Sequence, residues 1–156
     1  MAKEIERKFL VVGDAWRSLA PGVHYRQGYL NSSKERSVRI RAMGEKAVIT
    51  VKGPTRGIER LEFEYEIPYD DCTAMLENLA EKPLIEKTRY QIPMGRFTWE
   101  VDEFFGVNKG LVVAEIELPS EETAFEKPDW IGEEVSDDPR YFNSNLVRNP
   151  FSTWEQ

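Results

Sequence analysis

Acidic and basic side chains recur at alternate positions along much of this chain, and their combination suits a phosphate ligand that carries metal. The carboxylates of this pattern are Glu4, Glu6, Glu62, Glu64, Glu100, Asp102, Glu115 and Glu117. The cations are Lys8, Arg39, Arg41, Lys52, Lys87 and Arg89. Clustered carboxylates bind hard divalent cations such as Mg²⁺ or Mn²⁺, whereas guanidinium and ammonium groups bind phosphate oxygens. Phosphoryl transfer needs both kinds of group, because its catalysis is chiefly positioning and charge neutralisation.

The spacing of these residues indicates that they lie on β-strands. Successive side chains of a strand point to opposite faces, so residues two apart share a face. In the segment 59–67, for example, Leu61, Phe63 and Tyr65 alternate with Glu62 and Glu64. The same alternation predicts strands over residues 4–12, 24–30, 37–42, 47–53, 59–67, 84–92, 97–102 and 111–118.

These strands predict an α+β fold built on an eight-stranded antiparallel β-barrel with a charged lumen. An open sheet with one wet face would fit the alternation too, but closure removes the exposed strand edges. A few flanking helices are expected, over residues 15–19, from Asp70 to Leu79, and at the C-terminus over residues 138–147. They are too few to cover the apolar outer face, so we expect part of it to be buried in a homodimer.

The enclosed charges have two interpretations. They could form a lattice of ion pairs that neutralises itself. Each ion taken from water costs several kcal/mol unless it is paired, and such lattices are often no more stable than a hydrophobic replacement. Stability alone is therefore a poor reason to build one, and a metallated phosphate chain is the better explanation.

Composition excludes several other classes of protein. The net charge of −7 disfavours broad affinity for nucleic acid or anionic membranes. A single histidine, His24, and a single cysteine, Cys72, are too few for the usual zinc sites and for an internal disulfide. No signal peptide or long apolar segment is evident, so we expect a cytoplasmic protein with no membrane helix. At 156 residues the chain suits a single domain.

The ordered motifs of the chain resemble the CYTH domain of the triphosphate tunnel metalloenzymes. They are Glu4-x-Glu6-x-Lys8, Arg39-x-Arg41, Thr50-Val51-Lys52-Gly53, Glu62-x-Glu64, Glu86-Lys87-Thr88-Arg89-Tyr90 and Ala114-Glu115-Ile116-Glu117. The resemblance runs from near residue 2 to about residue 148 and is closest to the short bacterial members. It implies an eight-stranded barrel, a tunnel that binds a triphosphate, and hydrolysis that depends on a divalent metal.

The resemblance also implies a role for each matching residue. Glu4, Glu6, Glu115 and Glu117 would bind the metal; Lys8, Arg39, Arg41, Lys52, Lys87 and Arg89 would hold the phosphates. Two of these cations, Lys8 and Lys87, would also be catalytic residues. Glu62, Glu64, Glu100 and Asp102 would bind a second metal, orient the water or balance the cations. Tyr29 is a candidate for accepting a proton or positioning water, although an ordinary tunnel-wall tyrosine fits equally well, since a phenol is a poor base at neutral pH.

The function expected from these residues is hydrolysis of inorganic tripolyphosphate. Thiamine or nucleoside triphosphatase activity and adenylate cyclase activity are the alternatives that the same fold permits. A module that binds polyphosphate or a nucleotide without catalysis is the alternative of a different class.

Overall fold

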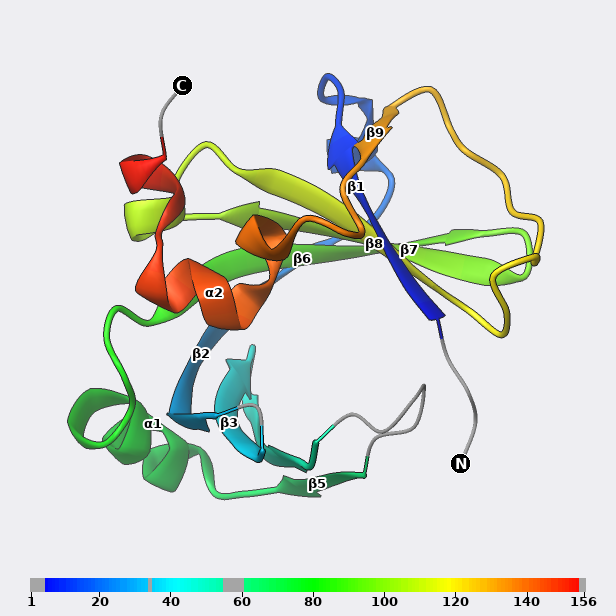
Figure 1. The fold of residues 1–156 in the computed structure, drawn as a ribbon. Helices are drawn as coiled ribbons and strands as arrows, with labels where there is room; N and C mark the ends of the chain where they lie inside the picture. The colour runs from blue at the N-terminus through cyan, green and yellow to red at the C-terminus, as the bar shows by residue number, and fades with distance from the viewer. Residues whose placement is uncertain (1–4, 34, 55–60, 155–156) are drawn as a thin grey trace.

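The computed structural model describes residues 5–33, 35–54 and 61–154, and Figure 1 shows their arrangement. Within these residues the chain forms one antiparallel sheet of nine strands in the order β5-β4-β3-β2-β6-β7-β8-β1-β9. The strands are β1 (Ile5–Val11), β2 (Gly22–Ser32), β3 (Ser37–Met43), β4 (Lys46–Lys52), β5 (Glu62–Glu66), β6 (Ile85–Met94), β7 (Phe97–Phe104), β8 (Val112–Leu118) and β9 (Ile131–Glu134). The antiparallel sheet and its flanking helices confirm the predicted class of fold.

The sheet differs from the prediction in its strand count and in its closure. It has nine strands rather than eight, and no strand pairing in the described part of the chain joins β5 to β1 or β9. The additional strand, β9, explains why β5 does not pair with β1. One edge of β1 pairs with β8, and β9 occupies part of the other edge through Phe9 and Val11. Val135 extends this contact, because its N–H donates to the carbonyl of Lys8 at 2.8 Å. Among the described residues the sheet is therefore curled but not closed by strand pairing, and Figure 1 shows β5 apart from β1.

Helix α1 (Tyr69–Asn78) covers the outer face of β3 and β4. Cys72 and Leu76 are fully buried there against Ile40 and Ala47. The loop after α1 packs onto β2 at Gly28, where a Cβ atom would lie 2.9 Å from the Ala80 side chain. Acidic residues occupy the first turn of α1, where they interact favourably with the helix dipole.

A second apolar core lies outside β1, β7 and β8. Phe9, Trp99, Val101 and Ile116 are buried in it, and the edge-to-face contact of Phe9 with Trp99 has a centroid distance of 5.5 Å. The short 3₁₀ helix η1 (Ala15–Ser18) adds the buried Trp16 to this cluster. Apolar side chains thus point outward from the curled sheet here, so the charged side chains at the alternate positions, such as Glu6, Lys8, Glu100 and Glu115, point inward. Arg7 and Glu103 are on the outer face instead, where they pair with Glu134 and Arg17.

The C-terminal segment is two short helices rather than the single predicted one. The 3₁₀ helix η3 (Pro139–Tyr141) and helix α2 (Asn143–Arg148) are separated by Phe142, whose backbone is extended. Leu146 and Val147 of α2 are buried against the sheet next to Tyr29 and Ile85. A last 3₁₀ helix, η4 (Phe151–Thr153), follows, and η2 (Gly106–Asn108) precedes β8. The break at Phe142 matters because it directs this segment toward the inside of the sheet.

Part of the outer surface remains apolar. Leu61, Phe63 and Tyr65 are 59%, 49% and 62% exposed next to and along β5. These are the residues that the alternation assigned to the outer face; the homodimer expected from such a surface stays a prediction. None of the helices in the described ranges has the length and apolar character needed to cross a membrane.

Candidate active site

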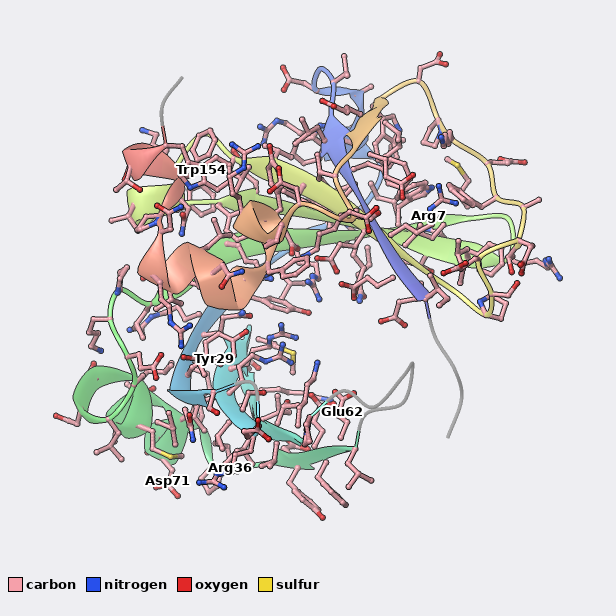
Figure 2. All side chains as sticks on the ribbon, viewed as in Figure 1. Arg7, Tyr29, Arg36, Glu62, Asp71 and Trp154 are labelled. Carbon is pink, nitrogen blue, oxygen red and sulfur yellow. The ribbon has the colours of Figure 1, made fainter. Side chains whose placement is uncertain are left out.

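The inner face of the curled sheet encloses a cavity of about 430 Å³, which we call the lumen. Its walls carry Glu6, Lys8, Tyr29, Arg39, Arg41, Lys52, Glu62, Glu64, Lys87, Arg89, Glu100, Glu115 and Glu117, together with Phe142 and Asn143. Each of the strands β1 to β8 contributes at least one of these side chains. Figure 2 labels Tyr29 of β2 and Glu62 of β5, both on the lower part of the curled sheet. Of the predicted site residues, Glu4 lies outside the described residues and Asp102 lies behind the lumen wall.

Four carboxylates meet on one side of the lumen. Glu6 of β1 is directly opposite Glu117 of β8, and Glu115 of β8 is directly opposite Glu100 of β7. Like charges at directly opposed positions destabilise a sheet unless something compensates them. Glu6 is accessible from the lumen, yet the enclosing protein and the nearby Glu115 carboxylate raise its pKa to about 7.

This acidic side fits a divalent cation in its chemistry. All its donors are carboxylate oxygens, the ligands that Mg²⁺ and Mn²⁺ prefer, and a cation would relieve the repulsion that raises the pKa of Glu6. In the part of the chain that the structure describes, which omits Glu4, no three acidic, histidine or cysteine side chains are already grouped as a metal site.

The buried carboxylate of Asp102 forms ion pairs with two of the lumen cations, Lys87 and Arg89. Its carboxylate accepts hydrogen bonds from Nε and Nη2 of Arg89 at 2.8 and 2.9 Å, and it pairs with Lys87 Nζ at 2.9 Å. Burial alone would raise the pKa of Asp102, but Lys87 and Arg89 outweigh it and hold this pKa well below its usual range. Asp102 is 2% exposed. Its position suits the balancing of cations, one of the three roles expected for it, rather than direct contact with a ligand.

The opposite side of the lumen is cationic. Arg39 and Arg41 of β3 lie beside Lys52 of β4. Burial lowers the pKa of Arg41 to about 10, and the neighbouring Arg39 and Arg89 contribute to the shift. Arg39 Nε is buried and has no hydrogen-bond partner among the described residues. A buried, unsatisfied donor in a crowd of cations is what an anionic ligand would satisfy.

Two glutamates of β5, Glu62 and Glu64, lie close to this cationic side. Glu62 lies 3.8 Å from Lys52 Nζ, measured from its Oε1 atom. The Thr50 hydroxyl donates a hydrogen bond to Glu64 Oε1 at 3.0 Å. Both glutamates are exposed on β5 in the described structure, so they are accessible to solvent.

The C-terminal segment completes the lumen with contacts that the alternation did not predict. Lys8 Nζ lies 3.3 Å from Glu115 Oε1, donates to the carbonyl of Tyr141 at 3.2 Å, and lies 5.3 Å from the centre of the Phe142 ring. Lys87 Nζ donates to Oδ1 of Asn143 at 3.1 Å. Lys8 and Lys87 thus contact Tyr141 and Asn143, which are far away in the sequence. The alternation of residues along a strand cannot predict such contacts.

Gln27, which contacts the lumen residue Arg41, is not among the site residues predicted from the sequence. Its side chain is fully buried, and its Oε1 accepts a hydrogen bond from Arg41 Nε at 2.8 Å. It shares a strand face with Tyr25 and Tyr29, so the period of two could have identified it. Tyr29 itself is 7% exposed and packs in the core cluster of Leu146 while it borders the lumen.

The lumen shares wall residues with a hollow on each side. A cavity of about 610 Å³ shares Tyr29, Arg39, Lys52 and Phe142 with it, and it also contains Arg148. A hollow of about 360 Å³ shares Glu100 and Glu117. The larger cavity adds Arg148 and Glu35 to the charged residues that it shares with the lumen, and the smaller hollow adds Arg96.

Comparison with known proteins identifies the class to which this fold and lumen belong. The model of the CYTH domain matches residues 2–145, so the chain belongs to the CYTH domain family.

Two relatives within this class are close enough to compare along their whole length. An inorganic triphosphatase of Acetivibrio thermocellus is 59% identical over 156 residues, which is 100% of both chains. An inorganic triphosphatase of Nitrosomonas europaea is 38% identical over 149 residues, covering 92% of this chain and 96% of the relative.

Solved structures agree with this assignment. The crystal structure of the inorganic triphosphatase NE1496 superimposes with a TM-score of 0.72 and 35% identity, covering 94% of this chain and 95% of the other. A putative adenylate cyclase from Bacillus halodurans, at 18% identity and a TM-score of 0.60 over 78% and 83% of the two chains, shares the fold alone.

Proposed function

We propose that this chain is a phosphoanhydride hydrolase that cleaves inorganic tripolyphosphate in the lumen with the help of a divalent metal, Mg²⁺ or Mn²⁺. The observation that carries the proposal is the division of one cavity into a carboxylate side and a cationic side, with contributions from β1 to β8. The inorganic triphosphatase activity of two full-length relatives supports it.

In this mechanism the cationic side binds the phosphate chain. Arg39, Arg41 and Lys52 approach it from β3 and β4, while Lys87 and Arg89 approach from β6. Together they neutralise the non-bridging oxygens and hold the terminal phosphorus in line for attack. Asn143 and Asp102 position Lys87 through its two short contacts.

The acidic side would hold the metal and position the attacking water. The cation would be held by Glu6, Glu115 and Glu117 together with Glu4. When bound, the cation supplies Lewis-acid neutralisation of the phosphate oxygens and makes a bound water more acidic. The water oxygen forms the new bond to the terminal phosphorus, the bridging P–O bond breaks, and a carboxylate takes up the proton. Lys8, close to Glu115, neutralises the charge that develops on the departing diphosphate.

The second-tier residues and Tyr29 retain alternative roles in this proposal. Glu62, Glu64 and Glu100 line the lumen and would bind a second metal, orient the water or balance the cations. Tyr29 borders both the lumen and the larger cavity, where it would position water or simply form part of the wall.

The test is release of orthophosphate from tripolyphosphate, ATP and thiamine triphosphate, each with Mg²⁺ or Mn²⁺. We expect the highest kcat/KM on tripolyphosphate, because the lumen walls are almost entirely polar and charged and offer little apolar surface to a base. Faster turnover of ATP or thiamine triphosphate would contradict the choice of substrate. Tight binding without turnover of any of the three would favour a non-catalytic binding module.

A further inference from the structure

The ring of Tyr25 contacts three of the lumen cations at once. Its centre lies 5.0 Å from Arg89 Cζ, 5.2 Å from Arg41 Cζ and 5.9 Å from Lys87 Nζ. Each distance is within the range in which a cation is attracted to the face of an aromatic ring. Tyr25 is 8% exposed, so water competes little with these contacts.

The position of Tyr25 in the sheet explains this coincidence. Tyr25 of β2 is directly opposite Lys87 of β6, and Arg89 lies two residues further along the same strand. On the other side of β2, Arg41 is paired with Gln27, two residues from Tyr25. Because residues two apart share a face, the ring lies on the inner face between the cations of β3 and those of β6.

Without an opposing group these cations would repel one another. Arg89 and Arg41 both act to lower the pKa of Lys87, and burial is the larger contribution that brings it to about 7. Asp102 compensates Lys87 and Arg89 but forms no direct ion pair with Arg41 in the described structure. Gln27 supplies Arg41 with a neutral acceptor. The negative face of the Tyr25 ring is the contact that all three cations share.

We infer that Tyr25 is a positioning residue whose aromatic face holds Arg41, Lys87 and Arg89 together for binding of the phosphate chain. The inference rests on the proposed function, and it assigns the effect to the ring rather than to its hydroxyl group. The phenylalanine variant should therefore keep the effect and the leucine variant should lose it.

The experiment measures binding of inorganic tripolyphosphate by calorimetry in the presence of a chelator, so that binding is separated from turnover. Y25L should bind about 10-fold more weakly than the wild type, and Y25F should bind within about 2-fold of it. Replacing Tyr25 with phenylalanines that carry one, two and three fluorines weakens the ring face while preserving its shape. Affinity should then fall stepwise with each added fluorine.

The control is Tyr90, which lies on the outer face of the neighbouring strand β6 and packs edge-to-face on Trp16 at 5.1 Å. Y90L should change thermal stability but leave tripolyphosphate affinity near the wild-type value. Equal affinity loss in Y25L and Y90L would indicate a general packing defect and would overturn the inference. A flat fluorine series would also overturn it.

These outcomes are separable from failure of the proposed function. A wild-type protein that hydrolyses tripolyphosphate but shows a flat fluorine series would refute the role of Tyr25 alone. A wild-type protein that binds tripolyphosphate, responds to the fluorine series and fails to hydrolyse it with Mg²⁺ or Mn²⁺ would refute the hydrolase alone. A wild-type protein that neither binds tripolyphosphate with the chelator present nor hydrolyses it with Mg²⁺ or Mn²⁺ would refute both.

Discussion

Asp102 and Arg89 form a two-point ion pair behind the lumen wall, with Nε–Oδ1 and Nη2–Oδ2 distances of 2.8 and 2.9 Å. The same carboxylate compensates Lys87, which is fully buried. One anion thus fixes two cations that face the lumen, and it links the stability of the fold to the geometry of the site.

The variant D102N should therefore be strongly destabilised. Removing one member of a buried ion pair leaves an uncompensated charge and typically costs about 3–5 kcal/mol. The free energy of unfolding from urea denaturation measures this. E103Q is the matched control, since Glu103 lies on the same strand and pairs with Arg17 at 2.6 Å where both side chains are partly exposed; it should cost no more than about 1 kcal/mol. Equal losses in the two variants would contradict the anchoring role of Asp102.

The acidic side of the lumen should bind the metal. E6Q and E117Q each remove one charged oxygen donor, so each should lower kcat by about 100-fold or more while the thermal midpoint stays unchanged or rises, because repulsion between the opposed carboxylates is relieved. Calorimetric titration with Mn²⁺ in the absence of substrate should show weaker binding in both variants. E133Q, an exposed carboxylate on β9, should match the wild type in both measurements. Unchanged Mn²⁺ affinity in E6Q and E117Q would exclude these residues as ligands.

Removal of the metal gives a second test of that assignment. Dialysis against a chelator should abolish phosphate release, and added Mg²⁺ or Mn²⁺ should restore it, because the proposed reaction depends on the cation for charge neutralisation. Circular dichroism should stay unchanged on chelation, since the described fold is held by its sheet pairing and apolar cores. Full activity after exhaustive chelation would contradict the metal dependence.

Loss of Arg39 should affect activity and stability in opposite directions. R39A removes a cation that binds phosphate, and we expect kcat/KM to fall by about 100-fold, or roughly 3 kcal/mol in transition-state stabilisation, by analogy with loss of one oxyanion donor. The free energy of unfolding should stay constant or increase, because the unsatisfied Nε atom and the repulsion of Arg41 are both removed. R17A, which removes a cation of the outer surface, should leave kcat/KM unchanged. A large loss of stability in R39A would show that its role is structural.

The ion pair of Arg7 with Glu134 should contribute to stability above acidic pH. The hydrogen bond from Arg7 lowers the pKa of Glu134 from 4.5 to about 2. A carboxyl group whose pKa is lower in the folded state contributes stability that is present above its unfolded pKa and is lost as pH falls through the folded one. This contribution should therefore disappear between about pH 4.5 and pH 2.

Its size should be about 1 kcal/mol, because both side chains are partly exposed. Urea denaturation of the wild type and of E134Q across this pH range measures the difference. E134Q should be less stable than the wild type at pH 6 and equally stable near pH 2, whereas E133Q should follow the wild type throughout. A difference between E134Q and the wild type that does not change with pH would contradict the ion pair.

The sequence predicted most of the strands and the inner face of the sheet because both follow from a period of two. Lys87, Arg89, Glu115 and Glu117 lie on the inner face as the alternation indicated. Closure could not be predicted this way, because it depends on which strand occupies the free edge of β1. β9 has only four residues and no regular alternation, yet it takes part of that edge.

The contacts of the C-terminal segment with the lumen lysines could not be predicted from the alternation either, for a different reason. Tyr141 reaches Lys8 with its backbone carbonyl, a group that every residue carries, so residue type gives no signal. Asn143 reaches Lys87 only because the chain is extended at Phe142 between two helices. Tyr25 lies within the strand predicted over residues 24–30, but its contact with three cations depends on the register of β2 with both neighbours.

The strict alternation along β8 constrains how genes of this type can change in length. Deleting the codon of Glu115 would turn Glu117 toward the buried Trp99 and send Ile116 into the lumen, since the two faces exchange with every single-residue shift. Insertions and deletions that survive selection should therefore accumulate in the connections between strands, such as the long segment between β8 and β9, and be absent from the strands themselves.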